Sequence, residues 1–260
     1  MSLLLSISTS TRCSGCALWG DDGPVGSVIS VAAHRHAEFL MPAIDELCRT
    51  AGMGPSDLDA VVVDVGPGLF TGLRVGIAAA NSIALARRVP VVGITSLEVL
   101  AHPHRRTPGV VASVVDARRS EVYWATFGHL ATGGSASGEV KWGQLSPAVV
   151  TAPELLAEHL SAIKAPVLAV GDGAHRYASV IEAHAEVGPV SSPGELWPSP
   201  VVLAEIGARR LFSPGAEHGE GALAATPGTL AEALYLRQAD VRIGWEQLGG
   251  RVPAAAPPQA

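Results

Sequence analysis

The chain has 260 residues, of which 48% are apolar and 16% charged, so it can bury the cores of two ordinary domains and is not a disordered polypeptide. Its formal charge of −6 argues against a protein that binds nucleic acid alone, because such proteins usually carry a basic surface. Three basic pairs can contact phosphates locally, although we interpret them first as solvated side chains: Arg87-Arg88, Arg105-Arg106 and Arg118-Arg119.

The first residues carry neither a basic segment nor a long apolar run, and no window approaches the roughly 20 apolar residues of a membrane-spanning helix. We therefore expect a cytoplasmic protein without membrane contact. The three cysteines fit a reducing compartment. Cys13 and Cys16 have CxxC spacing, but they lie between two strand-like runs and not at the start of a helix, which argues against redox chemistry.

The first half of the chain predicts three short strands joined by tight turns, followed by alternating helices and strands. This βββαβα order differs from a plain Rossmann alternation, in which a crossover helix follows the first strand. The predicted strands are residues 3–8, 15–19, 25–31, 58–65 and 89–94, and the predicted helices are residues 36–51 and 70–88.

The second half begins again with two strands, at 110–116 and 121–127, after a polar, proline-containing link at 102–109. A helix through Leu160, a strand at 167–170 and a helix at 200–212 follow. The repeated order predicts a two-lobed α/β fold. We expect lobes at 1–104 and 105–238, with the C-terminal helix able to pack back on the first, and a flexible tail at 239–260.

A glycine-rich turn separates the buried strand 58–65 from the helix 70–88. Backbone N–H groups at such a turn can bind phosphate, so Gly66, Gly68 and Arg74 are candidates to lie near a nucleotide. However, no lysine follows the glycines and Arg74 lies inside the helix, unlike a Walker motif. A tight turn with close packing is the simpler interpretation.

Helix 70–88 is small or apolar apart from a line of polar residues every seven positions, Arg74, Asn81 and Arg88, which predicts burial on nearly every side. Small residues four apart would let another helix approach. We predict a partner interface on this helix and helix 36–51, unless the second lobe or the C-terminal helix covers that side, and we expect Gly76→Leu to block it without unfolding the monomer. The candidate interface residues are Leu40, Ile44, Leu47, Gly72, Gly76, Ala80 and Ile83.

The segment Gly66-Pro67-Gly68-Leu69-Phe70-Thr71-Gly72-Leu73-Arg74 resembles the Gly-Pro-Gly-x-Phe-Thr-Gly-x-Arg signature of the TsaB (YeaZ) family, with Leu69 where Ser is common. Further similarities follow in the same order along most of the chain. They are Ile7-Ser8-Thr9-Ser10-Thr11, His36-Ala37-Glu38-Phe39-Leu40-Met41-Pro42, Ser96-Leu97-Glu98-Val99-Leu100-Ala101, Asp116-Ala117-Arg118-Arg119-Ser120-Glu121-Val122-Tyr123, Gly171-Asp172-Gly173-Ala174 and Leu234-Tyr235-Leu236-Arg237.

This resemblance implies a two-lobed fold related to actin, sugar kinases and Hsp70. It implies a scaffold for TsaD, which transfers the threonylcarbamoyl group to adenosine 37 of tRNAs reading codons that start with A. TsaE, a small ATPase, joins that assembly, and the first-lobe helix pair contacts TsaD or a second copy. The chain itself would hold no cofactor, since ATP and metal belong to the partner subunits, and would meet tRNA only through the complex.

The residues agree with a lost active site. Actin-like kinases place a carboxylate at the end of the first strand, and the matching residue here is Ser8. The close histidine pairs, His34 with His36 and His102 with His104, have the wrong spacing for one helical face. Asp64 is interpreted as a polar strand end. We expect no catalytic residue and no metal ligand; the alternatives are an actin-fold ATP-dependent phosphotransferase and a homodimeric binding module.

Overall fold

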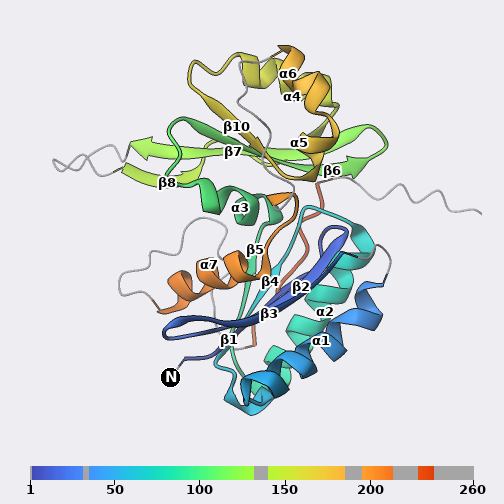
Figure 1. Cartoon of the computed structure of the whole chain (residues 1–260), viewed down its shortest axis with the longest axis vertical. Coiled ribbons are helices and arrows are strands. Elements are labelled where there is room, and N and C mark those ends of the chain that lie inside the picture. The colour runs from blue at the N-terminus through green and yellow to red at the C-terminus, as the bar shows by residue number, and fades with distance from the viewer. Residues whose placement is uncertain (1, 32–34, 132–139, 185–194, 213–227, 237–260) are drawn as a thin grey trace, which may run out of the picture.

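A computed structural model describes residues 2–31, 35–131, 140–184, 195–212 and 228–236. Two sheets form the frame, and helices lie on both faces of each (Figure 1). The first sheet has the strand order β3-β2-β1-β4-β5; the second has the order β10-β6-β7-β8, with β9 paired to β7. This arrangement is the two-lobed actin-like α/β fold that the sequence predicted.

The first sheet combines an antiparallel meander with two parallel strands. β1 (Leu4–Ser8), β2 (Cys13–Gly20) and β3 (Gly23–Val31) form the meander. β4 (Ala60–Asp64) and β5 (Val91–Ile94) run parallel to β1 and to each other. β1 and β4 are buried along their whole length, as expected for central strands that are covered on both faces.

Helices cover both faces of this sheet. α1 (His36–Ala51) and α2 (Phe70–Arg87) lie on one face, and α7 (Pro200–Phe212) lies on the other (Figure 1). α1 ends at Gly52, whose φ of 67° is the left-handed conformation that closes many helices, and the short 3-10 helix η1 (Pro55–Asp57) follows. On the opposite face, Gly207 lets α7 approach closely, because a Cβ there would lie 2.3 Å from Val62 Cγ2.

The second sheet follows a connection made by α3 (Ser96–Ala101) and the 3-10 helix η2 (His102–His104). Its strands are β6 (Val110–Arg118), β7 (Glu121–Ala131), β8 (Val140–Gln144), β9 (Val149–Thr151) and β10 (Val167–Val170). α3 covers one face, while α4 (Pro153–Ser161) and α6 (Ala178–His184) bury apolar side chains against the other. The short α5 (Asp172–Arg176) lies at the end of β10.

Most predicted elements are confirmed, with three differences. β2 begins at Cys13, so Cys13 and Cys16 both lie within a strand and not between two strands. The predicted polar link at 102–109 begins with η2, which continues directly from α3. The strands β8 and β9 and the short helices α5 and α6 were not predicted, since segments of three to seven residues carry little periodicity.

Two segments return from the C-terminal half to the first sheet. α7 packs on β1 and β2, where Ser6 Oγ donates to the carbonyl of Pro200 at 2.6 Å. Residues 228–236, which we call the strap, run beside α2 and are red in Figure 1. The lobe boundaries at 104 and 238 stay predictions, and the predicted tail lies outside the described residues.

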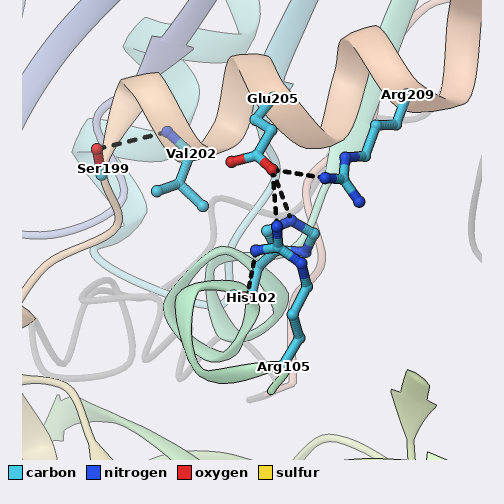
Figure 2. Close-up of polar contacts among 6 residues, drawn as sticks. All are labelled: His102, Arg105, Ser199, Val202, Glu205 and Arg209. Carbon is cyan, nitrogen blue, oxygen red and sulfur yellow. Dashed lines mark hydrogen bonds and ion pairs between the residues drawn. The ribbon is translucent and has the colours of Figure 1, made fainter. Parts of the chain in front are cut away.

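Ion pairs tie α7 to the connection between the two sheets. Glu205 accepts from Arg105 at 3.2 Å and from Arg209 at 3.0 Å, and its carboxylate lies 3.5 Å from His102 Nε2 (Figure 2). One turn further along α7, Arg210 pairs with Glu98 of α3 at 2.6 Å. The α3–η2 connection is therefore held against the first sheet.

Candidate functional site

A buried carboxylate lies where β1, β4 and α3 meet, at the carboxyl ends of the parallel strands. Asp64 ends β4 and is 1% exposed. Its Oδ2 accepts from Ser8 Oγ at 2.9 Å and from Ser10 Oγ at 2.5 Å. Its Oδ1 accepts from Ser96 Oγ at 2.6 Å and from the Gly66 N–H at 3.0 Å. Burial raises the pKa of Asp64, and the four donors oppose that rise.

This cluster is closed on itself. Each carboxylate oxygen of Asp64 already accepts two hydrogen bonds, so this side chain links three elements and is not an exposed base. Ser8 stands where actin-like kinases carry a carboxylate, and its hydroxyl donates a hydrogen bond to Asp64. The sequence indicated Ser8 and Asp64 separately, but their pairing depends on the register of β1 with β4.

The glycine-rich turn packs against the neighbouring β1–β2 turn. Gly66 has φ 95°, and its carbonyl accepts from the Ser96 N–H at 2.8 Å. A Cβ on Gly68 would lie 2.1 Å from the Ser10 carbonyl oxygen, which also accepts from Leu69 N–H at 2.6 Å. These are the contacts of a tight, closely packed turn. The role of Gly66 and Gly68 near a nucleotide stays a prediction.

Arg74 points away from this cluster. It is exposed on α2, and its guanidinium carbon lies 3.8 Å from the centroid of the Phe70 ring, a cation–π contact. Phe70 in turn lies beside Tyr235 of the strap, with the ring centroids 5.5 Å apart. Arg74 is therefore part of an aromatic surface at the start of α2.

A narrow pocket lies between the turns of the two sheets. It leaves almost no room even for a water-sized molecule, whereas ordinary small-molecule sites offer roughly 300–1,000 Å³. The pocket is too small for a whole nucleotide in this conformation. Its lining residues are Ser10, Thr11, Arg12, Leu69, Val115, Asp116, Arg118 and Asp172.

The residues predicted for a partner interface lie mostly inside the chain's own core. Leu40, Ile44 and Leu47 are 1%, 6% and 6% exposed, and Ile83 is partly buried against the same cluster. These side chains face the chain's own core, and their part in a partner interface stays a prediction. The amphipathic pattern that identified them marks the inward face of α1.

The small residues of α2 let it pack closely on the end of β1, and not on a partner's helix. Gly72, Gly76 and Ala80 face the sheet and are buried. A Cβ on Gly72 would lie 2.0 Å from the Thr9 carbonyl oxygen, and a Cβ on Gly76 would lie 2.3 Å from Thr9 Oγ1. The expectation that Gly76→Leu would leave the monomer folded is thus contradicted, because the side chain has no room.

α2 keeps one exposed face, which sequence reasoning did not identify. The sheet covers its inward side, α1 lies beside it, and the strap binds Asn81. Leu85 on the remaining face is 54% exposed. The prediction of burial on nearly every side is correct only in part. The exposed positions, which lie opposite the glycine line, are Phe70, Thr71, Arg74, Ala78, Ser82, Leu85 and Ala86.

The histidines and cysteines have no shared site among the described residues, where no group of three or more His, Cys, Asp or Glu could hold a metal ion. His36 is buried and its Nδ1 contacts Ser14 Oγ, whereas His34 lies outside the described part. Burial raises the pKa of Cys13 to about 11 and that of Cys16 to about 12. Three positions apart in β2, the two thiols point to opposite faces of the sheet.

No helix in the described ranges is long and apolar enough to span a membrane.

Comparison with known proteins gives a consistent result. A family model described as "TsaD: tRNA N6-adenosine threonylcarbamoyltransferase" matches residues 23–141. The chain is 29% identical to the tRNA threonylcarbamoyladenosine biosynthesis protein TsaB of Escherichia coli, covering 95% of this chain and 99% of that protein. It is 30% identical to the Bacillus subtilis TsaB over 208 residues, covering 78% and 86%.

Solved structures show the same similarity. A Pseudomonas aeruginosa protein described as similar to peptidase YEAZ matches with a TM-score of 0.70 at 28% identity, over 91% of this chain and all of that one. A second structure, YeaZ from Pseudomonas aeruginosa, matches with a TM-score of 0.66 at 27% identity, over 88% of this chain and all of that one. These matches extend over both sheets, so the similarity is not confined to one lobe.

Proposed function

The chain belongs to the TsaB family, and on that premise we propose that it is a non-catalytic subunit in threonylcarbamoyladenosine biosynthesis on tRNA, working in the cytoplasm beside a TsaD-like transferase. The observation that carries the non-catalytic part is the closed Asp64 cluster. An actin-like phosphotransferase needs a carboxylate at the end of the first strand that is free to organise metal and phosphate. Here that position is Ser8, bonded to Asp64.

The pocket supports the same conclusion. It has almost no free volume, far less than a nucleotide needs, and the glycine turn beside it is filled by the Ser10 backbone. For an ATP-dependent phosphotransferase, the first alternative, both the pocket and the glycine turn would have to open. One structural relative is described as similar to a peptidase. A peptidase would need an activated nucleophile with an oxyanion site, and Ser8, Ser10 and Ser96 all donate hydrogen bonds to Asp64.

We propose that the partner docks on the exposed face of α2, with ATP and metal held by the partner subunits. This face carries the short side chains of Thr71, Ala78, Ser82 and Ala86, together with Arg74 and Leu85, which is more than half exposed. Small side chains let a second helix approach closely and bury apolar area at little entropic cost. A second copy of the chain, the homodimeric alternative, would compete with the partner for this face. A TsaE-like ATPase would join the assembly.

The experiment replaces the chain in a depleted host and measures threonylcarbamoyladenosine in bulk tRNA. Wild type should restore the modification, and Ala78→Arg should not, because a long charged side chain blocks the face without disturbing the core. Ala183→Arg on α6 is the matched control, since Ala183 is also an exposed helical alanine. Wild type and Ala183→Arg should capture a TsaD homologue, and Ala78→Arg should not.

Three results would contradict parts of this proposal. Unchanged threonylcarbamoyladenosine on depletion would remove the chain from the pathway. Normal assembly of the Ala78→Arg variant would exclude α2 as the docking face. Turnover of ATP by the isolated chain with Mg²⁺ would overturn the non-catalytic role and favour the phosphotransferase.

A further inference from the structure

The β6–β7 turn holds two arginines in an unfavourable backbone conformation. β6 and β7 pair up to Arg118 and Glu121, so Arg119 and Ser120 form a two-residue turn. Arg118, Arg119 and Ser120 have φ values of 63°, 54° and 59°, the left-handed region that normally favours glycine or asparagine. Strained non-glycine residues are concentrated at binding sites, which directs attention to these side chains.

Two more arginines lie at the same place. Arg118 Nη1 pairs with Asp116 Oδ2 at 3.2 Å, and Arg176 of α5 pairs with the same oxygen at 3.3 Å. Arg12, from the β1–β2 turn of the other sheet, lines the narrow pocket together with Arg118 and Asp116. We call Arg12, Arg118 and Arg176 the arginine rim.

Asp116 orients Arg118 and Arg176 and leaves hydrogen-bond donors on both guanidinium groups. The carboxylate is 6% exposed, whereas the side chains of Arg118 and Arg176 are 45% and 56% exposed. Each guanidinium has five N–H donors, and the pair to Asp116 leaves most of them available. Asp172, the other acid of the pocket, already accepts from the Asp116 N–H at 3.0 Å and is largely buried.

The rim is therefore a positive region on a chain of net charge −6. Its size and exposure decide which anion it fits. A pocket with almost no free volume cannot enclose a nucleotide, but exposed arginines on turns of both sheets can contact successive phosphates of an extended strand. Planar guanidinium groups suit phosphate oxygens in particular.

We propose that the arginine rim binds the sugar-phosphate backbone of tRNA directly. This inference rests on the proposed function for the identity of the RNA. It also differs from the expectation drawn from the sequence, in which tRNA reaches the chain only through the complex. Binding is electrostatic and independent of base sequence, so it positions the tRNA for the partner subunit.

The test measures the anisotropy of a fluorescent tRNA transcript with the full-length chain at several salt concentrations. Arg12→Gln/Arg176→Gln should weaken binding and reduce the slope of log K against log [salt] by roughly 1.5–2, for two lost phosphate contacts. Arg35→Gln/Arg49→Gln is the matched control: it removes the same charge, and both side chains are exposed, at 71% and 70%. That control should keep the wild-type slope.

Each other outcome overturns the inference. Equal weakening by both double variants would show a nonspecific charge effect, and no weakening by either would show that the rim is not used. Competition by micromolar ATP would assign the rim to a nucleotide. The single variant Arg12→Gln, which leaves the Asp116 pairs intact, covers the case in which the double variant melts early. Restored threonylcarbamoyladenosine together with unchanged tRNA affinity would reject this inference while leaving the proposed function standing.

Discussion

Asn81 and Ala231 exchange two hydrogen bonds although 150 residues separate them. Asn81 Nδ2 donates to the Ala231 carbonyl at 3.0 Å, and the Ala231 N–H donates to Asn81 Oδ1 at 2.9 Å. The Leu234 N–H then donates to the Val65 carbonyl at 2.8 Å. Because Ala231 packs in the core of the first sheet and Leu236 against that of the second, the strap ties the two lobes together.

We predict that Asn81→Ala releases the strap. Both bonds are lost and the buried Ala231 backbone loses its partners, so the free energy of unfolding should fall by about 1–3 kcal/mol. Hydrogen exchange should speed up at Ala231 and Leu234 in particular. Ser82→Ala is the control, because Ser82 is exposed and bonds only the carbonyl of Ala78 within its own helix. Equal protection of the strap in both variants would contradict the prediction.

Gly76→Leu should destabilise the monomer itself. The first added carbon already lies 2.3 Å from Thr9 Oγ1, so α2 must move away from β1, at a cost of roughly 3 kcal/mol or more. Ala78→Leu, two positions along the same helix, points to solvent and should change stability by less than about 0.5 kcal/mol. Urea unfolding of the two variants provides the comparison, and similar midpoints would argue against the close approach.

Asp64 should make stability fall as pH rises. Burial raises its pKa in the folded state, so ionisation is harder in the fold than in the unfolded chain. The stability that the neutral acid contributes is fully present below the ordinary value of 3.8 and is lost as pH rises through the folded pKa. Asp64→Asn should therefore gain stability relative to wild type as pH rises above 3.8. The opposite trend would mean that the four donors outweigh burial.

His102 should act in the opposite direction. Burial, and after it the charges of Arg105 and Arg209, lower the pKa of His102 to about 4. The unfolded chain takes up the proton near pH 6.5 and the folded chain does not, so stability should fall as pH decreases from about 6.5 to about 4. His102→Gln should remove this decrease, whereas His175→Gln at an exposed position of α5 should keep it. Thermal melts across that range decide the matter.

The cysteines of β2 should be unreactive while the protein is folded. With pKa values of about 11 and 12, Cys13 and Cys16 carry very little thiolate at pH 8. Iodoacetamide should label them at least roughly 100-fold more slowly in native protein than in urea. Rapid native labelling, or a disulfide between them under mild oxidation, would contradict their placement on opposite faces of the strand.

The order of elements in the first lobe could be predicted because its strands and helices are long and periodic. The Val-rich run that became β4 and the turn residues around Gly23 determine that region locally. The glycine signature also identified the family correctly. The chemical role of the signature was harder to predict: the sequence favoured a packed turn over a phosphate loop at Gly66 and Gly68, and the contact of Gly68 with the Ser10 backbone comes only from the tertiary structure.

The inward and outward faces of α2 show what the sequence alone could not determine. Its small residues allowed a close approach by some other element, and composition could not say whether that element was a partner's helix or the end of β1. Only the tertiary structure decided, because Gly72 and Gly76 meet Thr9 through the pairing of β1 with β4 and the fixed crossing of α2 over them. Likewise, the strap reaches Asn81 from 150 residues away in the sequence, and Arg12, Arg118 and Arg176 come from three separate segments, so no local pattern encodes these contacts.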